Sequence, residues 1–428
     1  MYIKRNYYLN QLISSLGNGL VKIVTGPRRS GKSFLVFHLF KDYLLNQGVS
    51  DDHIIELSLD SAKNIEYRNP LSLVAYFDER HHSDGKTYYF LIDEIQFVKN
   101  CQNPFLKDQE VTFYDSLNQF LGYYDTEIII TGSNSNRLSK DIATEFRGRG
   151  WQIRMHPLSF SEFKEGRTTL GLDDFGLWNL YRLYGGLPAI TNIPDIPSKR
   201  KYLEEVFNVT YRKDIIDRYG LRSDTSISDI TKIRASSVGS FVNPQKISDT
   251  FLFKEKTSIS CPTVKRFLGY REDSFLLSKA ERYDIKGRRF IQANYKYYFE
   301  DMGLRNAAVL FTGEDQEPHF MENIVYNELI RRGYHVSVGI ISGMESGKKK
   351  DYEVDFVADK GGEKVYIQSA LLIPDKEKRN QEKRPLRKIK DSFKKIIITK
   401  YSGDGLYDED GILHMNLFGF LEHPNKIA

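Results

Sequence analysis

The sequence predicts an α/β protein whose first half is built on a parallel sheet. Residues 21–25 are β-branched and apolar, and after a glycine-bounded loop the residues at 33–45 are apolar at helical spacing. Three more strand patterns, at 53–59, 88–94 and 126–134, alternate with helical ones. Strands that alternate with helices form parallel sheets with helices on both faces. In such sheets, binding and catalytic groups collect at the carboxyl ends of the strands.

The composition is that of an ordinary folded protein. A chain of 428 residues is long enough for about three domains of ~150 residues. Two cysteines are too few for a disulfide framework. No apolar run reaches the roughly 18 residues of a membrane helix, and the first residues lack the apolar stretch of a signal peptide. We expect a cytoplasmic protein without membrane contact, and the net charge of +5 permits nucleic-acid contact without requiring it.

The loop after the first strand has the spacing G-x-x-x-x-G-K-[ST] between a strand and a helix. Its glycines allow successive backbone N–H groups to point at phosphate oxygens, and the helix N-terminus adds positive charge. We expect Lys32 to reach the β- and γ-phosphates of a nucleoside triphosphate, and Ser33 to ligate Mg²⁺. The expected nucleotide-binding residues are Gly26, Pro27, Arg28, Arg29, Ser30, Gly31, Lys32, Ser33 and Phe34.

Two carboxylates end the strand pattern at 88–94. We expect Asp93 to bind Mg²⁺ and Glu94 to act as the general base toward the attacking water. Ser133 or Asn134, at the end of the pattern at 126–134, could orient that water or the γ-phosphate. A solvated strand end is the alternative for the two acids. The functional interpretation is stronger because the strand carries no other charge and follows a phosphate-binding loop.

Together these segments resemble P-loop ATPases of the AAA+/STAND group. The resemblance implies ATP as the nucleotide and an arginine finger in the segment at 144–150. Arg147 and Arg149 are the candidates, supplied in cis, by self-association or by a protein client; a solvated basic loop is the alternative. The Gly-Gly-Leu-Pro segment at 185–188 resembles the helical lid of archaeal-type ATPases with the AAA-14 domain.

From about residue 227 the pattern changes to short helices followed by two strands. These elements are expected at 230–238, 245–251, 261–270, 275–283 and 292–299. Their order resembles a winged helix-turn-helix, which implies contact with double-stranded DNA. Lys265 and Arg266 are then expected in the major groove, and Arg288 and Arg289 against phosphates. The alternative is a module that packs on the ATPase part and mediates protein contacts.

The last third resembles the restriction-endonuclease-like fold of PD-(D/E)XK nucleases, and domains of that kind end the AAA-14 ATPases under a label of unknown function. Those nucleases need an acid on a helix, an acid on a strand and a Glu/Gln-x-Lys motif on the next strand. Glu322 and Asp355 match the first two, and Gln368 matches the start of the third. Ala370 stands where the lysine belongs, so we expect a degenerate and inactive nuclease fold, unless a lysine among 348–350 has taken over.

We therefore expect four parts: a P-loop ATPase core at 1–158, a helical lid at 159–222, a winged-helix-like domain at 223–312 and a degenerate nuclease-like domain at 313–428. The expected function is Mg²⁺-dependent ATP hydrolysis that drives a switch acting on DNA. A nucleotide-gated protein-interaction switch without DNA is the alternative. An active metal-dependent endonuclease is the weakest of the three hypotheses.

Overall fold

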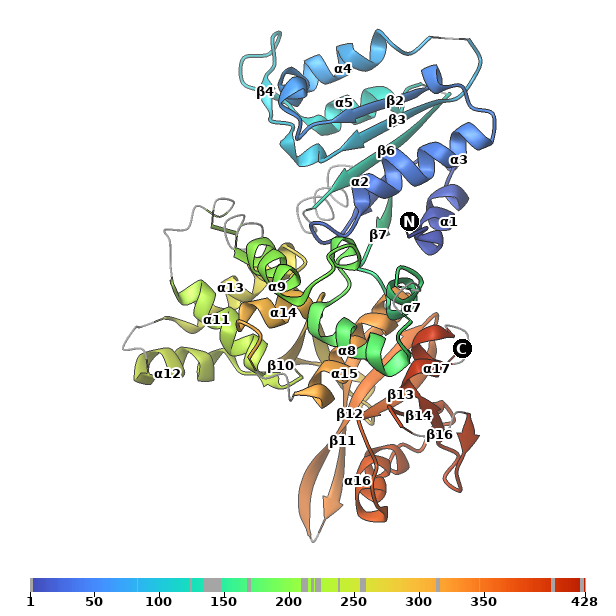
Figure 1. Cartoon of the computed structure of the whole chain (residues 1–428). Helices are drawn as coiled ribbons and strands as arrows, with labels where there is room; N and C mark the ends of the chain where they lie inside the picture. Colours follow the sequence, from blue (N-terminus) through green and yellow to red (C-terminus); the bar gives the residue numbers. More distant parts are fainter. Residues whose placement is uncertain are drawn as a thin grey trace. The chain divides into compact units, whose positions relative to one another are not determined.

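The computed structural model divides the chain into two compact units (Figure 1). Unit 1 comprises Met1–Pro157 with Asp273–Phe275, and unit 2 comprises Leu158–Glu272 with Leu276–Ala428. The structure describes residues 3–82, 84–123, 125–133, 148–167, 171–208, 215–216, 219, 225–237, 239–254, 259–312, 316–345, 347–401, 405–423 and 427. Within these ranges we find no helix that is both long and apolar enough to cross a membrane.

Unit 1 contains a sheet of five parallel strands in the order β2-β3-β6-β1-β7. The strands are β1 (Val21–Thr25), β2 (Ile54–Ser58), β3 (Tyr88–Asp93), β6 (Thr126–Gly132) and β7 (Gly150–Arg154). This arrangement confirms the predicted parallel α/β core. Because β3, β6 and β1 are neighbours, their carboxyl ends place the predicted phosphate loop and both predicted acids at one edge of the sheet.

Helices cover both faces of this sheet. They are α1 (Asn6–Ser14), α2 (Lys32–Phe34), the π-helix η1 (Leu35–Phe40), α3 (Lys41–Asn46), α4 (Pro70–Asp78) and α5 (Phe113–Phe120). The core on one face contains residues of α1, η1 and α3, such as Leu12 and Phe40. The core on the other face contains residues of α4 and α5, such as Phe77 and Phe120. The three central strands β1, β3 and β6 are buried on both sides, which explains their continuous apolar sequences.

Shorter elements complete unit 1. They are the 3₁₀ turns η2 (Asp51–His53), η3 (Ala62–Arg68) and η4 (Ile95–Phe97), and the small hairpin β4 (Cys101–Gln102) and β5 (Glu110–Val111). The turn η4 follows β3 directly, so the residues after the two predicted acids curl back toward the strand end. This local path matters for the site described below.

Unit 2 is built on a mixed nine-stranded sheet in the order β15-β16-β14-β13-β12-β11-β9-β10-β8. The strands are β8 (Phe241–Val242), β9 (Leu277–Asp284), β10 (Arg289–Phe299), β11 (His335–Glu345), β12 (Lys348–Lys360), β13 (Glu363–Ala370), β14 (Lys394–Thr399), β15 (Leu406–Tyr407) and β16 (Leu413–Asn416). Strands β9 and β10 form the antiparallel hairpin expected of a wing. However, β9 also pairs in parallel with β11, with Arg282 opposite Val338. The hairpin therefore belongs to the same sheet as the C-terminal strands.

The helices of unit 2 lie mostly in its first half. They are α7 (Phe160–Glu165), α8 (Asp174–Tyr184), η6 (Pro188–Thr191), α9 (Ile196–Glu205), α11 (Thr225–Ser236), α12 (Pro244–Lys254), α13 (Cys261–Asp273), α14 (Met302–Ala308), α15 (Glu317–Arg331), α16 (Lys376–Arg387) and α17 (Leu417–Glu422). The predicted order of short helices followed by a hairpin is present in α11, α12, α13, β9 and β10. The division of this half into lid, winged helix and tail stays a prediction.

The glycines of the Gly-Gly-Leu-Pro segment have a packing role inside unit 2. Asp301 is buried, and its carboxylate accepts the N–H groups of Gly186 at 2.7 Å and Leu304 at 3.0 Å. Gly185 has φ +72°, and a Cβ there would lie 2.2 Å from Asp301 Oδ1. A Cβ at Gly186 would lie 2.4 Å from the Leu158 carbonyl oxygen. The segment needs glycine because backbone and carboxylate approach it so closely.

Candidate active site at the carboxyl edge of the parallel sheet

The phosphate-binding loop lies between β1 and α2 and has the tight backbone that its sequence predicts. Gly26 has φ +146°, and a Cβ there would lie 2.0 Å from the carbonyl oxygen of Met155. Arg29 and Gly31 also have positive φ, at +62° and +94°. The Ser30 hydroxyl donates to the Pro27 carbonyl at 2.9 Å and closes the loop on itself. A loop of this shape presents backbone N–H groups to an anion.

Lys32 is held by the loop's own carbonyl oxygens. Its Nζ donates to Gly26 O at 3.1 Å and to Pro27 O at 2.8 Å, and the residue is only 4% exposed. Burial lowers the pKa of Lys32 to about 8, although the carboxylates of Glu94 and Asp93 act in the opposite direction. A buried ammonium with this pKa is stabilised by any phosphate that reaches it, because an opposite charge favours the charged form.

Ser33 and Asp93 contact one another directly. The Ser33 hydroxyl lies 2.9 Å from Oδ1 and 2.8 Å from Oδ2 of Asp93, and Thr131 donates its hydroxyl to Oδ1. Burial raises the pKa of Asp93, and the hydrogen bonds from Thr131 and Ser33 offset part of that rise. The two side chains predicted to bind Mg²⁺ are therefore together, and both offer the oxygen ligands that Mg²⁺ requires.

Glu94 occupies an uncommon backbone conformation at the end of β3. Its φ is +56°, in the left-handed region that few residues other than glycine adopt. The Thr131 hydroxyl accepts its N–H at 3.0 Å while donating to Asp93. Thr131 thus links the two acids, which a hydroxyl can do because it both donates and accepts.

Two other side chains, those of Ser133 and Gln96, contact the Glu94 carboxylate. Ser133 donates its hydroxyl to Oε2 at 3.3 Å, and Gln96 donates from Nε2 to the same oxygen. The structure thereby supports Ser133 as a residue near the predicted base. Sequence reasoning missed Thr131 and Gln96. Thr131 lies inside the strand pattern rather than at its end, and the contact of Gln96 depends on the 3₁₀ turn at η4.

Three further residues were predicted for this site: Asn134, Arg147 and Arg149. Asn134 and Arg147 lie outside the described residues. Arg149 is exposed, and its Nη1 donates to Asn118 Oδ1 at 3.0 Å within unit 1. Its role as an arginine finger stays a prediction.

In unit 2, the acids of the nuclease-like pattern surround a lysine from another strand. Lys296 on β10 is 3% exposed, and its Nζ lies 2.9 Å from Glu322 Oε1 and 2.5 Å from Glu353 Oε1. Burial alone would lower the pKa of Lys296, but Glu322, Glu353 and Asp355 together raise it. Tyr298 also donates its hydroxyl to Glu322 at 2.7 Å.

Asp355 and Gln368 complete this cluster. Burial and the neighbouring Glu322 raise the pKa of Asp355 well above its usual value, although the Ser369 N–H donates to it at 2.7 Å. The Oε1 atom of Gln368 is buried and has no hydrogen-bond partner among the described residues. No group of three or more potential metal ligands was found in the described part of the chain. The Lys296 ammonium pairs with two of these carboxylates. The lysines at 348–350 are exposed at the start of β12.

The four predicted DNA-contacting residues are all exposed in unit 2. Lys265 and Arg266 lie on α13, and Arg288 and Arg289 lie at the β9–β10 turn. Arg289 has a distant acidic neighbour, with Nε 3.8 Å from Asp284 Oδ2. Their exposure is compatible with phosphate contact, and nothing in the structure tests it.

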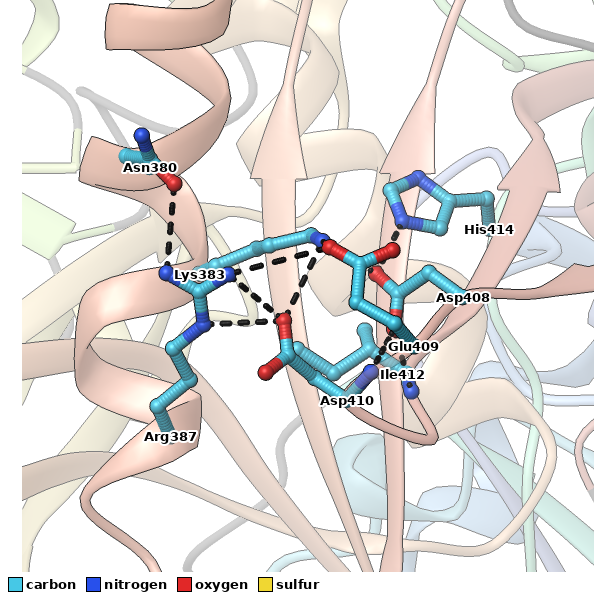
Figure 2. Close-up of polar contacts among 8 residues, drawn as sticks. All are labelled: Asn380, Lys383, Arg387, Asp408, Glu409, Asp410, Ile412 and His414. Carbon is cyan, nitrogen blue, oxygen red and sulfur yellow. Dashed lines mark hydrogen bonds and ion pairs between the residues drawn. The ribbon is translucent and has the colours of Figure 1, made fainter.

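Two cations of the basic helix α16 contact an acidic turn of the same unit. Figure 2 shows Lys383 and Arg387 directed at the acidic turn that contains Asp408, Glu409 and Asp410. Lys383 Nζ lies 2.8, 2.8 and 3.2 Å from carboxylate oxygens of these three residues, and Arg387 Nη2 lies 2.7 Å from Asp410. Two cations of this helix are therefore paired with carboxylates of unit 2.

Comparison with other proteins identifies the N-terminal part of the chain. A family model described as an AAA domain, AAA_14, matches residues 18–164. A second model, a domain of unknown function, DUF8612, matches residues 176–315. The second match spans most of the expected lid and winged helix rather than the nuclease-like tail.

An uncharacterized protein of Haemophilus influenzae is 36% identical over 399 residues, which are 93% of this chain and 93% of that protein. The chain belongs to the same family as that protein and carries an AAA_14 domain. An uncharacterized protein of Methanocaldococcus jannaschii is 28% identical over 385 residues, covering 87% of this chain and 79% of that one. The AAA_14 domain contains every residue of the edge site described above.

Among solved structures, the Aeropyrum pernix ORC1 protein in complex with DNA superposes on 72% of this chain and 92% of its own, with TM-score 0.33 and 10% identity. The DNA clamp loader delta protein of Bacillus subtilis superposes on 62% of this chain and 87% of its own, with TM-score 0.27 and 11% identity.

Proposed function

We propose that this protein is a Mg²⁺-dependent ATPase in which hydrolysis by the AAA_14 domain drives a conformational switch that acts on DNA. The observation that carries the proposal is the convergence of three strand ends on one site. Lys32 and Ser33 follow β1, Asp93 and Glu94 end β3, and Thr131 and Ser133 end β6. The lysine, the serine and the carboxylates are side-chain types that P-loop ATPases use. Thr131 and Ser133 donate hydrogen bonds to the two carboxylates.

The residues of the edge site fit ATP and Mg²⁺. The loop N–H groups and Lys32 would bind the β- and γ-phosphates, since the ammonium is buried and held by two carbonyl oxygens of the loop. The hydroxyl of Ser33 and the carboxylate of Asp93 would hold Mg²⁺, directly or through water. When bound, the metal neutralises charge on the phosphate oxygens.

The chain's own groups then perform the hydrolysis. Glu94 lies beside the metal-binding pair and accepts the proton of the attacking water as general base. Thr131 fixes the backbone of Glu94 relative to Asp93 through its two hydrogen bonds. Ser133 donates a hydrogen bond to the Glu94 carboxylate and so helps to orient it. An arginine from 147–149, in cis or from a partner, would complete the site and set the turnover rate.

The DNA part of the proposal rests on unit 2. Exposed arginines and lysines at α13 and at the β9–β10 turn are the chemistry that phosphates recognise. The alternative is a nucleotide-gated switch that contacts a protein client and no DNA. The nuclease hypothesis is disfavoured because Ala370 stands where the resemblance requires a lysine. Lys296 also pairs with Glu322 and Glu353, two acids of the cluster where a metal would be needed.

Phosphate release by the wild type and by Glu94→Gln, with and without duplex DNA at low and moderate salt, tests the proposal. Glu79→Gln is the matched control, because Glu79 is an exposed glutamate of the same unit. We expect an active wild type, an inactive Glu94→Gln and stimulation by DNA at low salt. A wild-type rate that ignores DNA favours the protein-client alternative. Activity that survives in Glu94→Gln contradicts the catalytic assignment.

A further inference from the structure

Gln96 folds back onto the residue that we assign as the general base. Glu94 has φ +56°, and the 3₁₀ turn that follows it is closed by the Phe97 N–H, which donates to Glu94 O at 3.0 Å. This turn places the side chain of a residue two positions later beside the Glu94 carboxylate. An ordinary strand would point residues 94 and 96 to the same face but about 7 Å apart.

The amide of Gln96 bridges two predicted catalytic side chains. Its Nε2 donates to Glu94 Oε2 and lies 3.3 Å from the Ser133 hydroxyl, which donates to the same Oε2. Within the described residues, no donor contacts Oε1 of Glu94. Two donors therefore fix one carboxylate oxygen, and the other is left to act on water.

The second atom of the Gln96 amide is an acceptor without a partner. Its Oε1 is buried, and no described residue donates to it. A buried amide oxygen without a hydrogen bond is costly, because it has lost water without replacing it. Such an atom next to a general base is well suited to accept a hydrogen bond from a water molecule.

We propose that Gln96 is a positioning residue for the hydrolytic water. Its N–H group orients the Glu94 carboxylate, and its amide oxygen accepts a hydrogen bond from the same water. In the step, the water oxygen bonds to the γ-phosphorus, the bond from that phosphorus to the bridging oxygen of ADP breaks, and the water proton passes to Oε1 of Glu94. This inference rests on the proposed ATPase function.

The chemistry explains why the side chain is an amide. A lysine at this position would pair with Glu94 and weaken it as a base, and a second carboxylate would repel it. A glutamine donates to the carboxylate without adding charge, and it has a second atom that can accept from water.

The test is steady-state ATP hydrolysis by the full chain carrying Gln96→Ala, with Glu94→Gln and Gln109→Ala beside it. Gln109 is an exposed glutamine of the same unit and is the matched control. We expect Gln96→Ala to lower kcat about tenfold to a hundredfold while the KM for ATP and the melting temperature change little. That split separates positioning of water from ATP binding and from folding.

The variant Gln96→Glu gives an independent readout. Two neighbouring carboxylates each hold a proton more tightly, so the acid limb of its pH–rate profile should move to higher pH. A Gln96 side chain that lies away from the Glu94 carboxylate in solution would leave the profile where it is.

The outcomes separate the inference from the function beneath it. A kcat for Gln96→Ala within about twofold of an active wild type, or an unshifted profile for Gln96→Glu, overturns the role of Gln96 and leaves the ATPase proposal standing. A wild type that releases no phosphate, or a Glu94→Gln variant that remains active, overturns the ATPase mechanism, and the role of Gln96 is rejected with it.

Discussion

The hydroxyl of Ser33 lies within hydrogen-bonding distance of both carboxylate oxygens of Asp93, at 2.9 and 2.8 Å. The two residues are sixty positions apart in the chain. Asp93 ends β3, Ser33 follows the loop after β1, and β6 lies between these two strands. A hydroxyl has one proton to donate, so Ser33 shares that proton between the two oxygens of Asp93. A metal ion that both side chains bind would take the place of this hydrogen bond. We regard this pair as the centre of the candidate active site.

Ser33→Ala should weaken ATP binding only when Mg²⁺ is present. The substitution removes one oxygen ligand and leaves the loop N–H groups and Lys32 in place, so we expect about a tenfold or larger loss of affinity with Mg²⁺ and little change with EDTA. Fluorescent-nucleotide titrations in both conditions measure this difference. Ser14→Ala is the control, because Ser14 is an exposed serine of the same unit. Equal losses in both conditions would contradict a metal-binding role.

Gly26→Ala should destabilise unit 1 more than Gly19→Ala. Both glycines have positive φ, but only Gly26 has a neighbour that a Cβ would strike, the Met155 carbonyl oxygen at 2.0 Å. The left-handed strain alone costs roughly 1–2 kcal/mol, and the clash adds about 1–3 kcal/mol. Urea unfolding of both variants in a Trp178→Phe background, where Trp151 of unit 1 is the remaining tryptophan, measures both. Equal losses for the two variants would mean that the close approach is absent.

Asp301 should make the stability of unit 2 decrease as the pH rises. Burial raises the pKa of Asp301 from 3.8 to about 6, so between these values the folded state binds more protons than the unfolded one. The free energy of unfolding therefore falls between about pH 4 and pH 6, by about 3 kcal/mol at most. Asp301→Asn should unfold more easily overall and lack this slope.

Unfolding of the wild type and Asp301→Asn at several pH values, followed by the buried Trp178 of unit 2, isolates this contribution. Other groups titrate in the same range, so the difference between the two proteins is the quantity to compare. A difference that does not vary with pH would show that the Asp301 carboxyl has its ordinary proton affinity.

Lys296→Met should destabilise unit 2 by about 3–5 kcal/mol, because it leaves buried carboxylates without their cation. The double variant Lys296→Met with Glu322→Gln should recover part of that loss. The wild type should not nick plasmid DNA in Mg²⁺ or Mn²⁺. Cleavage by the wild type that disappears in Asp355→Asn would instead establish an active nuclease centre.

Arg288→Ala with Arg289→Ala should reduce DNA affinity and its salt dependence. Each phosphate contact contributes about 0.9 to the slope of log affinity against log salt, so we expect the slope to fall by about 2. Arg387→Ala is the control, since Asp410 already engages that guanidinium (Figure 2). Fluorescence anisotropy with duplex DNA at several salt concentrations measures the slope. An unchanged slope in the double variant would favour a switch that does not use DNA.

Several elements could be predicted before the structure because their signals are local. The strand–loop–helix at 21–45, the strand that ends in Asp93 and Glu94, and the parallel sheet all follow from residue patterns within a few turns of chain. The short helices before the β9–β10 hairpin were predicted for the same reason. The contacts of Thr131 and Gln96 were missed because neither follows from hydrophobic spacing.

The sequence by itself determined the nucleotide loop, both acids of the edge site and the α/β class, since glycine spacing and apolar periodicity are properties of neighbouring residues. Only the tertiary structure decided which donors hold Glu94, why Gly185 and Gly186 must be glycine, and that Lys296 from a distant strand pairs with Glu322 and Glu353. The tertiary structure also shows that the expected wing hairpin pairs with the C-terminal strands in one sheet. Apart from the contact of Gln96, which depends on the turn at η4, these contacts join segments far apart in the chain. Their geometry depends on packing that residue patterns do not encode.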